Sequence, residues 1–268
     1  MARLSINELT TFRWTFEEDV RNYCAAGIEA IGVWRQKLSD YGEEQGIELL
    51  MESGLRVSSL LWAGGFTGSE GRSHKECIED AREAIRLAAA MDAGCLIVYS
   101  GPRAGHTHNH ARRLMRSALD EILPLADDVD LDLAIEPMHP GCAADWTFLT
   151  ELSEAVELLK SYDTPHMKLA FDTYHLCQNG DVTAIVKEII PRIAVVQLGD
   201  AKAPPDGEPN RSPLGEGVLP LKEVVAALEA GGYEGFYDVE LMGEDIERTG
   251  YDQLVTQSKQ AFESFLAN

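Results

Sequence analysis

Leu133-Ala-Ile-Glu136 is a short apolar run that ends in a carboxylate, and three similar runs follow it along the chain. They are Leu169-Ala-Phe-Asp172, Ala194-Val-Val-Gln197 and Phe236-Tyr-Asp-Val-Glu240. Each resembles a strand buried on both faces, and such a strand rarely ends in an acid that has no function. If the four strands are parallel and adjacent, three carboxylates and one amide converge at one edge of a sheet. This pattern predicts a site for a hard divalent cation there.

Outward from these runs, short apolar segments alternate with longer amphipathic ones, which indicates strand–helix units and a parallel sheet. We expect strands at residues 3–8, 30–34, 55–62, 95–100, 131–136, 167–172, 192–197 and 235–240. Helices should begin near residues 15, 36, 73, 111, 150, 182, 221 and 251, and Thr15 with Glu18 fits a capping box. Eight units predict an α/β fold, a (β/α)8 TIM barrel forming a single domain over residues 1–268. A doubly wound open sheet is the alternative, but it would not readily bring strands five to eight around one point.

The composition of the chain argues against some classes of binding partner. The 268 residues carry a net charge of -22, which argues against binding to nucleic acid because such binding needs basic residues. No apolar run is long enough for a membrane span, and the first residues lack the apolar run of a signal peptide. The five cysteines are scattered, which is typical of free thiols in a reducing compartment. We therefore expect a cytoplasmic protein with no membrane and no nucleic-acid partner.

Four motifs at the strand ends and one loop resemble those of a known family. The motifs are Glu136-Pro-Met-His139, Phe171-Asp-Thr-Tyr-His175, Gln197-Leu-Gly-Asp200 and Asp238-Val-Glu240, and the loop is Asn210-Arg-Ser-Pro-Leu-Gly-Glu-Gly217. Together they resemble the xylose-isomerase-like sugar phosphate isomerase/epimerase family, over essentially the whole chain. The resemblance implies a TIM barrel and a metal-dependent isomerase or epimerase that acts on a sugar, keto-sugar or polyol.

The resemblance also assigns residues. It implies that Glu136, Asp172 and Glu240 ligate one divalent metal ion, with Gln197 standing where members usually have a histidine. An amide oxygen can still be a ligand. Mn²⁺ is the first expectation, with Mg²⁺, Co²⁺ and Zn²⁺ as alternatives. The catalytic set would be Glu136, Glu240 and His175, with the two glutamates moving a proton next to a carbonyl through a metal-stabilised enediolate.

Other readings stay open. Glutamine at position 197 resembles the dehydroshikimate dehydratase branch of the family, so a lyase acting on a dehydroshikimate-like or keto-cyclitol substrate is the alternative. A non-catalytic binding barrel ranks below both. Arg211 is a candidate for binding substrate oxygens, although it could also be a solvated loop residue. The remaining candidates for contacts with a carbohydrate-like small molecule are His139, His106, Trp14 and Trp62. Arg211 and Lys202 are the only evident candidates for binding a phosphate, which favours a substrate without one. Barrels of this kind are frequently homodimers or homotetramers.

Overall fold

The strands pair side by side in chain order and close into a parallel barrel, from β1 through β8 and back to β1. The computed structural model describes residues 2–68, 71–178 and 182–267. Its strands are β1 (Arg3–Asn7), β2 (Ala30–Trp34), β3 (Arg56–Gly64), β4 (Cys95–Tyr99), β5 (Asp132–Ile135), β6 (Met167–Asp172), β7 (Ile193–Leu198) and β8 (Phe236–Val239). This arrangement confirms the predicted TIM barrel.

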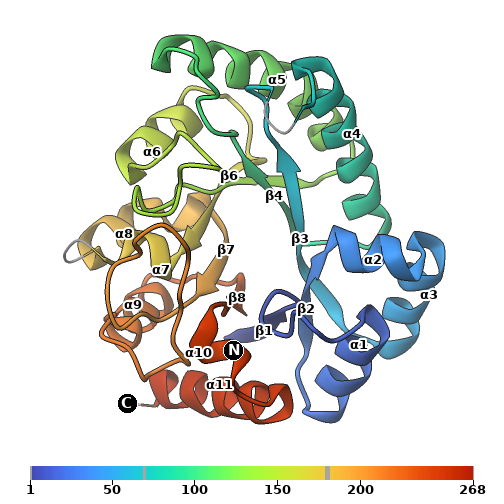
Figure 1. Cartoon of the computed structure of the whole chain (residues 1–268), viewed down its shortest axis with the longest axis vertical. Helices are drawn as coiled ribbons and strands as arrows, with labels where there is room; N and C mark the ends of the chain where they lie inside the picture. The colour runs from blue at the N-terminus through green and yellow to red at the C-terminus, as the bar shows by residue number, and fades with distance from the viewer. Residues whose placement is uncertain (1, 69–70, 179–181, 268) are drawn as a thin grey trace.

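Helices follow the strands and lie around the outside of the barrel, as Figure 1 shows. They are α1 (Phe16–Ala25), α2 (Arg35–Tyr41), α3 (Glu43–Ser53), α4 (His74–Ala90), α5 (His108–Asp128), α6 (Leu152–Lys160), α7 (Thr173–Leu176), α8 (Thr183–Ile189), α9 (Leu221–Ala230), α10 (Glu244–Glu247) and α11 (Tyr251–Leu266), with the 3-10 turn η1 (Ile190–Arg192). Their buried apolar faces pack on the outward side chains of the strands in one continuous core.

The two-residue period of the strands decides which side chains point into the barrel. Small residues such as Ala134, Ala170 and Val195 belong to the inner cluster. The core under the helices contains most of their sequence neighbours, namely Leu133, Ile135, Leu169, Phe171 and Val196. Continuing the alternation by two residues places Glu136, Asp172 and Gln197 on the inner side. The two-residue alternation that places small side chains inside the barrel therefore also directs the polar side chains at the strand ends toward its mouth.

Most predicted boundaries agree with the structure within a few residues, and the Thr15 capping box is confirmed. One segment differs, because the helix expected from residue 36 to 45 is two helices, α2 and α3. They meet at Gly42, whose φ of 109° lies in a region that residues with a side chain rarely adopt. The break lets α3 start in a new direction and pack on α1.

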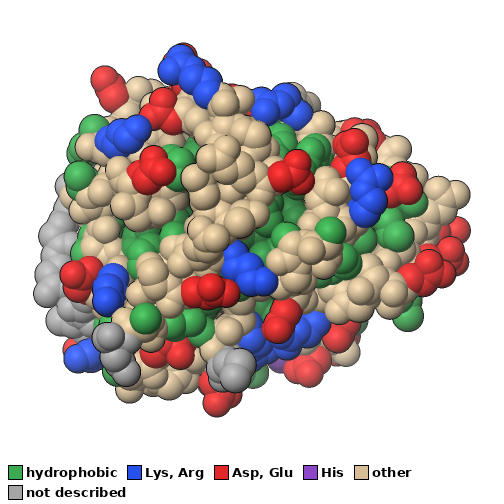
Figure 2. Space-filling view, turned by 90° about the horizontal axis from the view of Figure 1, so that it is seen from below, with side chains coloured by type: hydrophobic (Ala, Val, Ile, Leu, Met, Phe, Trp, Pro, Cys, Tyr) green, Lys and Arg blue, Asp and Glu red, His purple; other side chains and the backbone are tan. Residues whose placement is uncertain are grey.

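Within the described residues, none of the helices combines the length and apolar character that a bilayer-spanning helix requires. On the face shown in Figure 2, acidic and basic side chains are interspersed with apolar ones. Basic side chains do not gather into one region on that face.

Candidate metal and substrate site

The four polar strand ends lie together at one mouth of the barrel. Asp172 is the last residue of β6 and pairs in register with Gln197 of β7, while Glu136 and Glu240 directly follow β5 and β8. All four side chains are buried, and none is more than 6% exposed. Active sites of TIM barrels lie at this end of the strands.

Two of these acids and a histidine from the neighbouring helix α7 have the geometry of a metal site. One ligand atom from each of Glu136, Asp172 and His175 lies within 4.8 Å of the others. The Nε2 atom of His175 is 3.7 Å from Oε1 of Glu136 and 3.7 Å from Oδ2 of Asp172. His175 reaches this point because α7 starts immediately after Asp172, so the two residues are one helical turn apart. Two carboxylates and an imidazole suit several divalent metals.

Arg211, from the loop after β7, is buried against two of the acids. Its Nη2 atom donates to Oδ2 of Asp172 at 2.7 Å and to Oε1 of Glu240 at 2.9 Å. Gly199 makes room for it, because a Cβ at that position would collide with the guanidinium group. Arg211 thus neutralises part of the negative charge that the strand ends bring together.

Glu240 also accepts hydrogen bonds from two amide side chains. Nε2 of Gln197 donates to its Oε2, and Nδ2 of Asn7 lies 3.3 Å from the same oxygen. Oε1 of Gln197 is buried and has no hydrogen-bond partner among the described residues. A buried acceptor without a partner is costly, so this oxygen is available to a cation or to a donor of a bound molecule. The assignment of Gln197 and Glu240 as metal ligands stays a prediction.

Burial shifts the proton affinities of the site. It raises the pKa of Glu136 well above its ordinary value, and the charges of Glu240 and Asp172 add to the rise. Burial raises the pKa of Glu240 to about 7, although Arg211 opposes the shift. Burial also lowers the pKa of His175 to about 4, against the attraction of Asp172. Near neutral pH the imidazole is therefore uncharged, which is the form that binds a metal.

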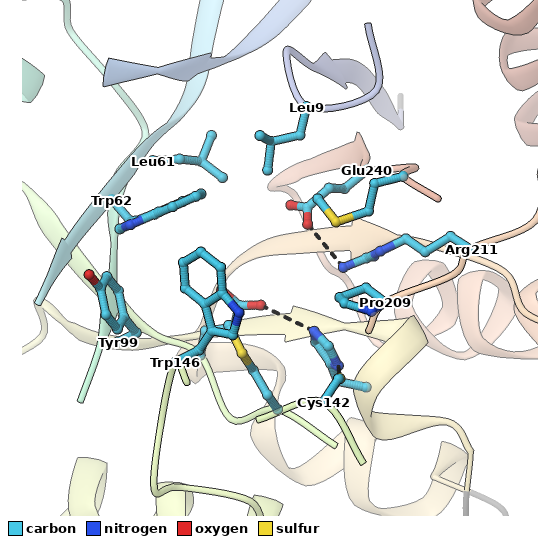
Figure 3. Close-up of a pocket in the computed structure, with 13 residues that line it drawn as sticks. Leu9, Leu61, Trp62, Tyr99, Cys142, Trp146, Pro209, Arg211 and Glu240 are labelled. Atoms are coloured by element: carbon cyan, nitrogen blue, oxygen red, sulfur yellow. Dashed lines mark hydrogen bonds and ion pairs between the residues drawn. The ribbon is translucent and has the colours of Figure 1, made fainter. Parts of the chain in front are cut away.

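Above the acids lies a cavity of about 140 Å³, shown in Figure 3. Glu136, His175, Arg211 and Glu240 line it, and so does Trp62. The residues that complete its lining are Leu9, Leu61, Tyr99, Met138, Cys142, Trp146, Pro209 and Met242. Sequence reasoning missed Trp146, although it lies on the same loop as Glu136 and an aromatic residue there was a usable signal.

Three predicted substrate-binding residues do not line this cavity. Nε2 of His106 is 3.1 Å from the carbonyl oxygen of Thr67, and Nδ1 of His139 accepts from the Gly141 amide at 3.0 Å. Trp14 packs edge-on against Tyr251, with ring centroids 5.4 Å apart. Their predicted contacts with substrate stay predictions.

Comparison with known proteins agrees with this geometry. The chain is 27% identical over 222 residues to L-ribulose-5-phosphate 3-epimerase UlaE of Escherichia coli O1:K1, covering 78% of this chain and 73% of that protein. Protein SMc04130 of Sinorhizobium meliloti 1021 has a similar structure, with a TM-score of 0.90, 27% identity and 97% of each chain covered. The IolI protein, whose crystal structure holds a zinc atom, has the same fold at 17% identity, with a TM-score of 0.84 and 98% of each chain covered.

The family assignment rests on more than these individual similarities. A model of the family described as "Xylose isomerase-like TIM barrel" matches residues 20–265, which include the strands β2 to β8 and the acids Glu136, Asp172 and Glu240. The chain therefore belongs to the xylose isomerase-like TIM barrel family.

Proposed function

We propose that this protein is a divalent-metal-dependent sugar isomerase or epimerase that removes and returns a proton next to a carbonyl group. The observation that carries the proposal is the buried trio Glu136, Asp172 and His175 at the base of a cavity, with Glu240 beside it. The similarity to an L-ribulose-5-phosphate 3-epimerase supports the reaction class.

The donor set fits a divalent ion. Glu136, Asp172 and His175 would hold it, and the unpartnered Oε1 of Gln197 together with Glu240 would complete the set. Such an ion would polarise a carbonyl oxygen and hold the neighbouring hydroxyl oxygen. Mn²⁺ is our first candidate because oxygen ligands dominate, and the zinc in the related fold of IolI supports a divalent site.

Two carboxylates on different strands would carry the proton. Glu136 and Glu240 both line the cavity, from β5 and β8, so they can approach one carbon from different sides. The donors on Glu240, from Arg211, Gln197 and Asn7, favour its ionised form and suit it to accept a proton. Burial and the nearby carboxylates of Glu240 and Asp172 raise the pKa of Glu136, so it holds a proton more readily and suits the opposite step.

Solvent exchange tests this proposal. The metal-loaded protein is incubated in D2O with keto-sugars, and NMR follows deuterium at the carbon next to the carbonyl. We expect incorporation by the wild type, and a loss of about 100-fold or more in Glu240→Gln and in Glu136→Gln, since positioned acid–base groups contribute that much. An exposed variant, Glu263→Gln on α11, should be unchanged. If the loaded wild type exchanges no proton of any keto-sugar or keto-cyclitol, the proposal fails.

One observation favours a second function. The family resemblance described above implies a histidine at the position of Gln197, and a glutamine there resembles the dehydratase branch. A dehydratase also begins by removing a proton next to a carbonyl, so the same cavity would serve it. The product separates the two functions, because a lyase lowers the mass by one water and creates a conjugated absorbance whereas an isomerase conserves mass.

A further inference from the structure

The wall of the cavity opposite Glu240 and Arg211 is aromatic. Trp62 and Trp146 meet at 90° with ring centroids 5.2 Å apart, and Tyr99 lies 6.0 Å from Trp146. Figure 3 shows these rings on one side of the cavity and Glu240 with Arg211 on the other. Aromatic faces pack well against the C–H face of a sugar, but they offer few groups that could solvate an anion.

Apart from the metal ion that the proposed function requires for the reacting oxygens, the base of the cavity has no cation to spare for a phosphate. Of the residues that line it, Arg211 alone carries a permanent positive charge, and its Nη2 is shared between Asp172 and Glu240. Three buried acids surround this single guanidinium group. A phosphate ester placed here would meet like charges at close range, which costs several kcal/mol in other complexes.

The rim where TIM barrels commonly bind phosphate is acidic in this chain. Such sites use the loops after the seventh and eighth strands and the start of a short extra helix. Here the short helix is α10, and its first turn carries Glu244, Asp245 and Glu247. The nearby cations are already paired: Lys202 with Asp245 at 2.9 Å, and Arg248 with Glu244 at 3.0 Å.

The opposite rim of the cavity offers few further cations that could bind a phosphate. Arg35 and Arg72, near the mouth after β2 and β3, both pair with Asp80, at 3.0 and 3.5 Å. Arg103, on the loop after β4, has no ion pair within the described residues, but it is exposed and does not line the cavity. It is a cation at this end that a long phosphate ester could recruit.

We propose that the substrate of this site is an uncharged, unphosphorylated carbohydrate whose C–H face packs against Trp62 and Trp146. This inference rests on the proposed function and narrows it. It separates this chain from the similar epimerase, whose name specifies a pentulose 5-phosphate. The acids bind the polar edge of the sugar, and the aromatic rings bind its apolar face.

A matched pair of probes tests the inference. L-ribulose and L-ribulose 5-phosphate, and D-fructose and D-fructose 6-phosphate, are compared by two readouts: quenching of tryptophan fluorescence on binding, and deuterium exchange with the metal-loaded protein. We expect each free sugar to bind about tenfold or more tightly than its ester. Trp146→Leu should raise KM about fivefold with little change in kcat, since ring packing acts on binding. Arg103→Ala should not change the preference for the free sugar over its ester in either pair.

The outcomes separate this inference from the proposed function. If an ester binds and exchanges better than its free sugar, the inference is overturned while the isomerase proposal stands. An ester preference that disappears in Arg103→Ala would identify the cation responsible and would equally overturn it. If the free sugars bind preferentially but exchange no proton, the inference stands and the proposed chemistry fails. If none of the four probes binds, the carbohydrate assignment falls.

Discussion

A buried lysine between β1 and the first helices allows a sharp test of how the mouth of the barrel is held. Nζ of Lys37 on α2 donates to Oδ2 of Asp19 at 2.6 Å, and to the carbonyl oxygens of Glu8 and Thr11 at 3.1 and 3.0 Å. Lys37 and Asp19 are almost fully buried. These bonds fix the loop after β1, and Leu9 of that loop lines the cavity.

Lys37→Met removes the cation and leaves the carboxylate of Asp19 buried without its partner. Breaking a buried pair in this way costs about 3–5 kcal/mol. That is a large part of the roughly 5–15 kcal/mol by which domains are stable. Urea unfolding at pH 7, followed by fluorescence and circular dichroism, measures the change. Lys222→Met, at an exposed position on α9, is the matched control and should change stability by less than about 0.5 kcal/mol.

The loss of stability caused by Lys37→Met should depend on pH, and the direction of the change can be predicted. Burial raises the pKa of Asp19 even with Lys37 present to oppose it, and it raises the pKa of Glu8 well above its ordinary value. Without Lys37 the folded variant binds protons more tightly than the unfolded chain. Its stability is therefore greatest at low pH and falls as pH rises through the raised values.

We thus expect the deficit of Lys37→Met to be smaller at pH 5 than at pH 8, and Lys37→Met/Asp19→Asn to recover part of it. A loss below about 1 kcal/mol, or one that is constant with pH, would refute the reasoning that the buried charge is the cause.

Two further predictions concern local structure. Thr15→Ala removes the side-chain acceptor of the capping box at α1 and should lower the free energy of unfolding in urea by about 1 kcal/mol. Thr15→Ser keeps the hydroxyl and should lower it much less. Equal losses in the two variants would show that the hydroxyl is not responsible. Gly199→Ala would force a Cβ against Arg211 and displace its guanidinium from Asp172 and Glu240. We expect it to lower kcat/KM in the exchange assay by about tenfold. Gly54→Ala, which strains the backbone at a φ of 75° at the end of α3 but does not touch the cavity lining, should not lower it; full activity in Gly199→Ala would mean that Arg211 is not held as we describe.

The barrel was predictable because its evidence is local and periodic. The strands β2 and β6 have the predicted bounds, and the residues at strand ends point inward by the two-residue alternation that the sequence already displays. Gly42 gave a weaker signal, since an isolated glycine inside a helical pattern can be tolerated or can break the helix. Only the packing of α3 against α1 decides between the two outcomes.

The site was predictable in part. His175 was expected to act in catalysis, and the structure places its Nε2 close enough to Glu136 and Asp172 for the three side chains to hold a metal ion together. The spacing of three residues from Asp172 was the available signal, but it becomes meaningful only if a helix starts there. The position of Arg211 depends on how the long loop after β7 folds back, which no local pattern specifies. Trp146 lies on the loop after β5, where an aromatic residue was a usable signal, but its orientation toward the cavity depends on how that loop folds.

Metal binding to the isolated protein tests the central claim most directly. Calorimetric titration of chelator-treated protein with Mn²⁺, and with Zn²⁺ as a second ion, is compared between wild type, Glu136→Gln and His175→Ala. His166→Ala is the matched control, because His166 pairs with Asp132 at 3.0 Å, away from the residues that line the cavity. We predict one site per chain in the wild type and in the control, and an affinity about 100-fold lower in both site variants. A wild type that binds neither ion, or site variants that bind as tightly as the wild type, would contradict the account.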